Sequence, residues 1–151
     1  MNDLAGRVFR TQRVLPHPPQ QVFDAFANPE VLARWWGPDG FTNTFETFEF
    51  RTGGRWKHMM RGPNGAEFQN ESVFLELTAP SVVVIHHVSN PRYVLRVSLA
   101  PRAAGTGTEI EWAQEFEDSG VAERIRHIVE PANEQNLNRL EAALTGGNPD
   151  G

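Results

Sequence analysis

Two histidines and one glutamine lie among apolar residues in β-rich runs, where such polar side chains can orient a ligand or transfer a proton. Successive side chains of a strand point to opposite faces of a sheet, so residues two apart share a face. Applied to the runs between residues 41 and 117, this alternation gives an inward set of Phe48, Phe50, Trp56, His58, Met60, Val83, Ile85, His87, Leu95, Val97, Leu99, Ile110, Trp112, Gln114 and Phe116. Apolar walls broken by a few polar groups are typical of a binding cavity.

The residues predicted to line this cavity and bind a ligand are Phe48, Trp56, His58, Phe74, Ile85, His87 and Val97. Phe74 comes from residues 66–78, where both alternations are apolar, and this ambiguity indicates a β-bulge that exchanges the faces of the strand. The histidines also have a structural interpretation, because a partly buried histidine is often hydrogen-bonded to backbone or water. Trp35 and Trp36 are expected to close the base of the core.

General acid-base catalysis is the chemistry that His58, His87 or a carboxylate such as Glu71 could perform in this setting. Burial in an apolar pocket disfavours the charged form, so it shifts the pKa of a histidine or glutamate. Nucleophilic catalysis finds no support, because the sequence has no cysteine and no Gly-x-Ser-x-Gly elbow. The Gly53-Gly54 pair lacks the spacing of a phosphate-binding loop. The sequence therefore assigns no catalytic residues.

Metal binding is not expected, although five histidines are present. His86 and His87 are adjacent, so in a regular strand they point to opposite faces and cannot hold one ion together. Glu123, His127 and Glu130 have helical spacing, which is more typical of a solvated charged face than of a metal site. We therefore expect no cofactor.

The elements that would position these residues begin with a strand over residues 7–15 and two short helices. Pro18 and Pro19 suit the first turn of one helix that ends near Asn28, and Pro29 opens a second helix that ends before Gly37. Six β-rich runs separated by turn residues then predict an antiparallel meander. Their bounds are approximately 41–50, 54–61, 66–78, 82–89, 92–100 and 107–117.

The C-terminal part is helical from Ser119, with an apolar side and an interruption at Pro131. Because proline breaks a straight helix, we predict that Pro131 opens a second, longer helix that ends near Thr145. The fold class is therefore α+β, with a seven-stranded curved antiparallel sheet wrapped around a long C-terminal helix.

Composition predicts one globular domain over residues 1–151, with an ordered core of about residues 5–146. The net charge of −5 and the scattered basic residues argue against nucleic acid as a partner. The absence of a long apolar run argues against membrane insertion, and the N-terminal residues lack the apolar core of a signal peptide. We therefore expect a cytoplasmic protein, and a homodimer is possible.

The order of elements resembles the helix-grip fold of the START and SRPBCC superfamily, which includes the birch pollen allergen. Within it, the sequence is similar to the branch named after the activator of the heat-shock-protein-ninety ATPase. The segments that carry this resemblance are Phe23-Asp24-Ala25-Phe26, Asn28-Pro29-Glu30, Trp35-Trp36, Gly53-Gly54-Arg55-Trp56, Arg61-Gly62-Pro63-Asn64-Gly65 and Glu109-Ile110-Glu111-Trp112 with Phe116.

Together, the cavity pattern and the resemblance predict binding of a small, largely apolar molecule between the sheet and the C-terminal helix. Such a ligand would be lipid-like, polyketide-like or aromatic. Two alternatives remain open. Related folds include cyclases and dehydratases without cofactors, so an acid-base enzyme is one of them. The name of the branch implies the other, a stress-response protein that docks on a chaperone.

Overall fold

The seven strands of the described chain form one antiparallel sheet in the order β1-β7-β6-β5-β4-β3-β2. The computed structural model describes residues 7–146. Its strands are β1 (Val8–Leu15), β2 (Thr42–Phe48), β3 (Arg55–Arg61), β4 (Glu67–Thr78), β5 (Val82–His87), β6 (Tyr93–Arg102) and β7 (Gly107–Phe116). The helices are α2 (Pro19–Ala27), α3 (Pro29–Trp35) and α4 (Ser119–Leu144), with a short 3-10 turn η1 (Ala103–Gly105). The predicted α+β helix-grip architecture is confirmed.

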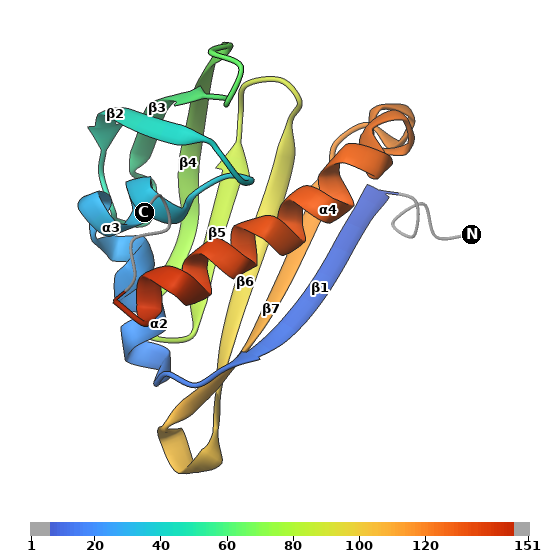
Figure 1. The fold of residues 1–151 in the computed structure, drawn as a ribbon. Coiled ribbons are helices and arrows are strands. Elements are labelled where there is room, and N and C mark those ends of the chain that lie inside the picture. Colours follow the sequence, from blue (N-terminus) through green and yellow to red (C-terminus); the bar gives the residue numbers. More distant parts are fainter. Residues whose placement is uncertain (1–6, 147–151) are drawn as a thin grey trace.

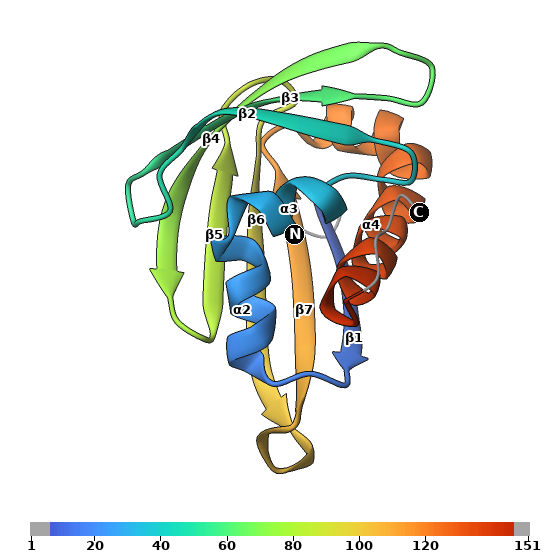
Figure 2. The ribbon, with the colours of Figure 1, turned by 60° about the vertical axis from the view of Figure 1, so that its left-hand side comes forward.

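The sheet curls so that all three helices lie on its concave side (Figures 1 and 2). β2 and β3 bend over α3, whereas α4 crosses the sheet near β7 and β1. This curvature lets one apolar sheet face close around the helices, and the core lies between them. Residues 5 and 6, where the predicted ordered core begins, lie outside the described residues. Within the described residues, no helix is long and apolar enough to span a membrane.

Prolines start the two short helices, as the sequence predicts. Pro19 occupies the first turn of α2, where its missing N–H is not needed for a helical hydrogen bond. Asn28 caps α3, because its side-chain oxygen accepts hydrogen bonds from the backbone N–H groups of Glu30 and Val31. The two helices bury a shared apolar side that includes Phe26 and Trp35.

The β4 strand contains the β-bulge that its double apolar pattern predicts. Phe74 pairs with Ile85, but the next pair in the register joins Glu76 and Val84, so Leu75 has no partner. Phe74 is therefore buried in the core and Leu75 is exposed. After the bulge the alternation of inward and outward side chains is shifted by one residue, so Leu77 packs against the core.

The C-terminal helix is continuous, and the predicted break at Pro131 is wrong. α4 runs from Ser119 to Leu144 with Pro131 inside it. A proline removes one helical hydrogen bond, to His127 O, and its ring collides with the preceding turn unless the helix bends. Figure 1 shows this bend, which separates residues 119–130 from the straight remainder of α4.

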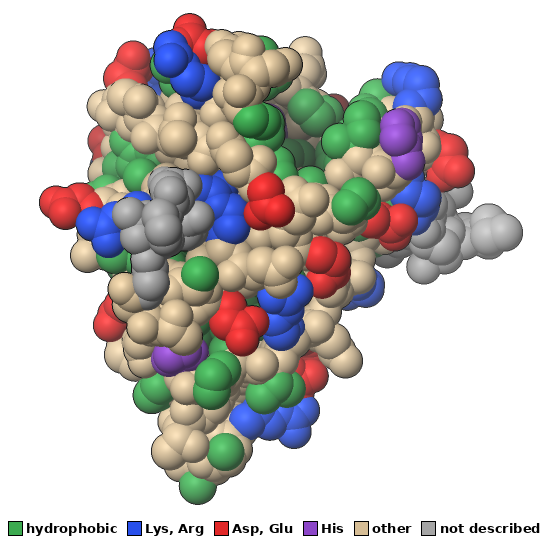
Figure 3. Space-filling view, viewed as in Figure 1, with side chains coloured by type: hydrophobic (Ala, Val, Ile, Leu, Met, Phe, Trp, Pro, Cys, Tyr) green, Lys and Arg blue, Asp and Glu red, His purple; other side chains and the backbone are tan. Residues whose placement is uncertain are grey.

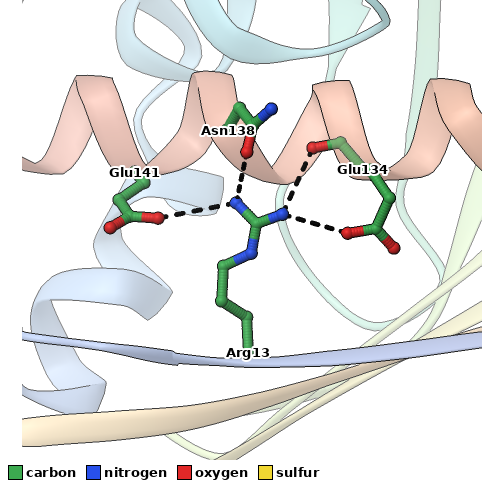
Figure 4. Close-up of polar contacts among 4 residues, drawn as sticks. All are labelled: Arg13, Glu134, Asn138 and Glu141. Carbon is green, nitrogen blue, oxygen red and sulfur yellow. Dashed lines mark hydrogen bonds and ion pairs between the residues drawn. The ribbon is translucent and has the colours of Figure 1, made fainter.

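The straight part of α4 is anchored to the edge strand β1 by Arg13 (Figure 4). The Arg13 guanidinium donates to Asn138 Oδ1 at 2.7 Å and forms ion pairs with Glu134 at 3.0 Å and Glu141 at 3.5 Å. These side chains are partly exposed, so each ion pair contributes only about 0 to 1 kcal/mol. Their common effect is to fix the position of α4 after Pro131 along the sheet.

Replacing Leu140 with alanine should lower the free energy of unfolding by about 2 to 4 kcal/mol. Leu140 is fully buried on the side of α4 that faces the sheet, and a rigid curved sheet can fill the resulting cavity only in part. Chemical denaturation measures the change. The control is Glu141→Ala, which loses one half-exposed ion pair and should cost less than about 1 kcal/mol. Equal costs for the two variants would contradict the packing of this helix face.

Candidate functional site

Aromatic rings from three distant segments meet in the core beside the bend of α4. Trp36, just after α3, lies between Trp56 of β3 and Trp112 of β7, with ring centroids 5.0 and 5.9 Å apart. The imidazole of His58 stacks on Trp56 at 4.3 Å. The inward alternation predicted for β3 and β7 is therefore correct, since these side chains are buried.

Several polar atoms in this cluster are buried without a hydrogen-bond partner. They are Trp56 Nε1, Trp112 Nε1 and both ring nitrogens of His58. Trp35 differs, because its Nε1–H donates to Ala25 O at 3.0 Å. Burying an unsatisfied donor or acceptor costs about 1 to 3 kcal/mol, so native proteins keep few of them without a reason. These unpartnered atoms are concentrated in one region of the described core.

Burial lowers the pKa of His58 to about 3, with a smaller lowering from the nearby His87. The imidazole is therefore neutral at physiological pH, with one N–H donor and one acceptor nitrogen. It supplies a polar but uncharged group to the core.

His87 is satisfied by its surroundings, in agreement with the structural interpretation of this residue. Its Nδ1–H donates to Pro91 O at 2.8 Å, and its Nε2 accepts from the Ser89 hydroxyl at 3.3 Å. The ring also stacks on Tyr93 at 4.5 Å. Burial lowers the pKa of His87 as well. These contacts fix the ring at the end of β5, against Tyr93 of β6.

A cleft of about 150 Å³ opens between the sheet, the loop after α3 and the bend of α4. Figure 3 shows a hollow rimmed by hydrophobic side chains beside this part of α4. The lining residues are Trp36, Gly37, Pro38, Met60, Tyr93, Leu95, Trp112, Gln114, Ile128, Val129, Ala132, Asn133 and Asn136. None of them carries a formal charge. Trp112, whose Nε1 is buried without a partner, belongs to its wall.

The seven residues predicted to bind a ligand lie elsewhere. Phe48, Trp56, His58, Phe74, Ile85, His87 and Val97 are in the packed core or against it, and none lines this cleft. Large aromatic rings fill the interior, where the alternation pattern predicted a cavity. Of the wider inward set, Met60, Leu95, Trp112 and Gln114 do reach the cleft. Ligand binding by the seven stays a prediction.

The α4 side of the cleft was missed by the sequence interpretation. Val129, Asn133 and Asn136 lie at i, i+4 and i+7, which is the spacing of one helical face. The predicted break at Pro131 divided this face between two helices. Asn133 donates to Gln114 Oε1 at 3.1 Å, and Asn136 donates to Trp35 O at 2.8 Å, so both side chains tie α4 to the other walls.

Arg139 holds in place the loop after α3, which forms one wall of the cleft. It is buried on α4 and donates hydrogen bonds to the backbone carbonyls of Arg34, Trp36, Gly37, Pro38 and Phe41. Gly37 has a positive φ of 97°, and a Cβ there would lie 2.7 Å from Met60 Cε. The close approach of this loop to β3 therefore depends on both the arginine and the glycine.

The carboxylates considered for acid-base or metal chemistry lie outside the cleft. Glu71 is ion-paired with Arg55 at 2.8 Å. On α4, Glu123 and Glu130 each form an ion pair with Arg126, at 3.5 and 3.4 Å. No group of three potential metal ligands occurs among residues 7–146.

A larger hollow of about 580 Å³ lies on the outer face of the sheet. Its walls carry half-exposed ion pairs, Arg7 with Glu115 and Arg96 with Glu76, both at 3.8 Å. Size alone favours this hollow as a binding site. We place the candidate site in the smaller cleft, because its walls are uncharged and mainly apolar and include Trp112, whose indole N–H is buried without a partner.

The profile of the family described as activator of Hsp90 ATPase homolog 1-like protein matches residues 16–145. The chain belongs to this family. The match includes α2, α3, the whole meander and all of α4, so every wall of the cleft lies within the matched residues. A comparison with curated proteins found no match.

Solved structures of bacterial proteins share this family fold. A protein from Arthrobacter aurescens is 22% identical, with a TM-score of 0.86 and coverage of 97% of this chain and 90% of the other. One from Nitrosomonas europaea is 20% identical, with a TM-score of 0.83 and coverage of 94% and 96%. An AHSA1-like protein from Aeromonas hydrophila is 19% identical, with a TM-score of 0.69 and coverage of 89% and 94%. At these identities the likeness shows the fold.

Proposed function

We propose that this protein binds a small, largely apolar molecule in the cleft between β6, β7 and the bend of α4. The observation that carries the proposal is the indole N–H of Trp112, which is buried in the cleft wall without an acceptor. A ligand that supplies an acceptor would remove the cost of this unsatisfied donor. The apolar lining would contribute the rest of the binding free energy.

The size of the cleft limits what it holds in this conformation. A dry cavity of about 150 Å³ accepts one benzene ring, whereas ligand pockets usually measure about 300 to 1,000 Å³. A larger ligand would require residues 119–130 of α4 to move outward about Pro131. This segment packs on a small separate cluster of Phe9, Phe116 and Ala122, with Arg126 4.6 Å over the Phe9 ring. Residues 119–130 are therefore the part of the cleft wall that can move to admit a larger ligand.

An enzyme in this cleft would need two ionisable groups that face one point. No lining residue is a carboxylate, a histidine or a lysine, and Tyr93 is the one ionisable side chain among them. The cleft therefore favours binding over acid-base catalysis.

Native mass spectrometry of the protein purified from cells tests this proposal. Organic extraction of the retained material and identification of the extract should yield an apolar molecule in stoichiometric amount. The mass should return to that of the chain alone after extraction. Recovery of ligand-free protein that also binds no added apolar probe would contradict the proposal.

Replacing Trp112 with phenylalanine should abolish more than half of the tryptophan emission change caused by the uncharged dye N-phenyl-1-naphthylamine. The substitution keeps an aromatic wall but removes the indole that reports on the cleft. Fluorescence titration measures the effect. Trp35→Phe is the matched control, because Trp35 is buried outside the cleft and should leave the emission change intact. The same loss in both variants would contradict the location of the site.

A further inference from the structure

The polar groups of the cleft restrict the chemistry of its ligand more tightly than its shape does. An indole N–H only donates, so the buried Trp112 Nε1 requires an acceptor. The Gln114 side chain accepts from Asn133 through Oε1, which leaves the Gln114 amide hydrogens for another partner. Tyr93 also lines the cleft, and burial raises the pKa of its hydroxyl, so this group keeps its proton. Three residues with donor groups thus line one small cleft.

The walls of the cleft offer no charged side chain to a charged ligand. None of the lining residues is Lys, Arg, Asp or Glu. The buried guanidinium of Arg139 is not among the lining groups and donates to the backbone carbonyls of Trp36, Gly37 and Pro38. The histidine in the adjacent core, His58, is neutral because burial lowers its pKa. A carboxylate in the cleft would therefore lose its hydration and gain no cation.

We propose that the cleft selects uncharged molecules of about one aromatic ring whose polar end is a carbonyl-type acceptor, and that Trp112 Nε1 donates the hydrogen bond that recognises it. This inference rests on the proposed function, since it assigns a ligand class to the same site. A purely apolar ring would leave the indole N–H unsatisfied, and a carboxylate would be buried without a counter-charge. A ketone, aldehyde or ester avoids both penalties.

Three ligands of matched size separate these possibilities: acetophenone, ethylbenzene and benzoate. Titration of ¹⁵N-labelled protein at pH 7 follows the indole N–H resonances, and the signal lost in Trp112→Phe identifies Trp112. Acetophenone should shift this resonance downfield and bind about fivefold or more tighter than ethylbenzene, which is the effect of one net hydrogen bond. Benzoate should bind at least tenfold more weakly than acetophenone.

The Trp112→Phe variant supplies the decisive comparison, because it should lose most of the preference for acetophenone over ethylbenzene. Phe68→Leu, a change of an exposed residue outside the cleft, should preserve the preference for acetophenone. Equal binding of ethylbenzene to the native protein, or tighter binding of benzoate, would overturn the acceptor rule and leave the site intact. Failure of all three ligands to shift any cleft resonance would instead overturn the proposed function.

Discussion

Replacing Arg139 with methionine should destabilise the protein by about 3 to 5 kcal/mol. Methionine has similar length and is apolar, so packing along α4 is largely kept. The backbone carbonyls of residues 34, 36, 37, 38 and 41 would all lose the guanidinium that they share. Each buried acceptor without a partner carries a penalty, and movement of the loop into water can relieve only part of it. Urea denaturation followed by circular dichroism measures the loss.

The controls separate the hydrogen-bond network from the charge. Arg139→Lys keeps the positive charge but presents a point donor instead of a planar fork, so it should restore at most half of the lost stability. Arg34→Met removes an exposed arginine and should change stability by less than about 0.5 kcal/mol. If Arg139→Met cost no more than Arg34→Met, the loop would be held by other contacts and Arg139 would not position the cleft wall.

The stability of the native protein should fall steeply between pH 6.5 and pH 3, and His58→Leu should remove much of this fall. The pKa of His58 is about 3 in the folded protein, against 6.5 without burial. In this pH range the unfolded chain binds a proton that the folded chain refuses, so acid favours unfolding. A shift of this size corresponds to roughly 4 to 5 kcal/mol, present above pH 6.5 and lost toward pH 3.

Denaturation curves collected at several pH values measure this difference. At pH 7 the His58→Leu variant should be as stable as the native protein or more stable, because it removes two buried nitrogens that have no partner. Part of the acid sensitivity should persist, since burial lowers the pKa of His87 in the same direction. His127→Gln, on the exposed side of α4, controls for loss of a histidine as such. Parallel pH profiles for the native and His58→Leu proteins would refute the assignment.

The sequence was sufficient for the fold because its signals are local. Alternation, turn residues and helix-starting prolines each depend on a few neighbouring residues, and they located all the strands to within about two residues. The bulge at Leu75 was also predictable, because two competing apolar alternations within one strand require a change of parity. The bend at Pro131 was not, since a proline ends one helix and kinks another according to the tertiary contacts on either side.

The site was predictable only in part, because its geometry depends on how the rings pack. Alternation identified Trp112 and Gln114 as inward residues, and both reach the cleft. The same rule could not show that Trp36 occupies the space between Trp56 and Trp112, which displaces the opening toward α4. No local pattern in the sequence predicts that Arg139 holds the loop after α3, because its acceptors are backbone carbonyls about a hundred residues earlier in the chain.

The pairing of β1 with β7 has a consequence for how the chain acquires its structure. These strands are the first and last of the sheet in sequence, and their paired residues, from Val8 with Glu115 to Leu15 with Thr108, are separated by on the order of a hundred residues. During synthesis the hairpins from β2 to β6 can pair as they emerge, whereas β1 has no partner until β7 is complete. Until then Phe9 and Leu15, both buried in the native fold, stay exposed to solvent. Closure of this loop should therefore limit the folding rate, and a nascent chain stalled before β7 should present an apolar strand to chaperones.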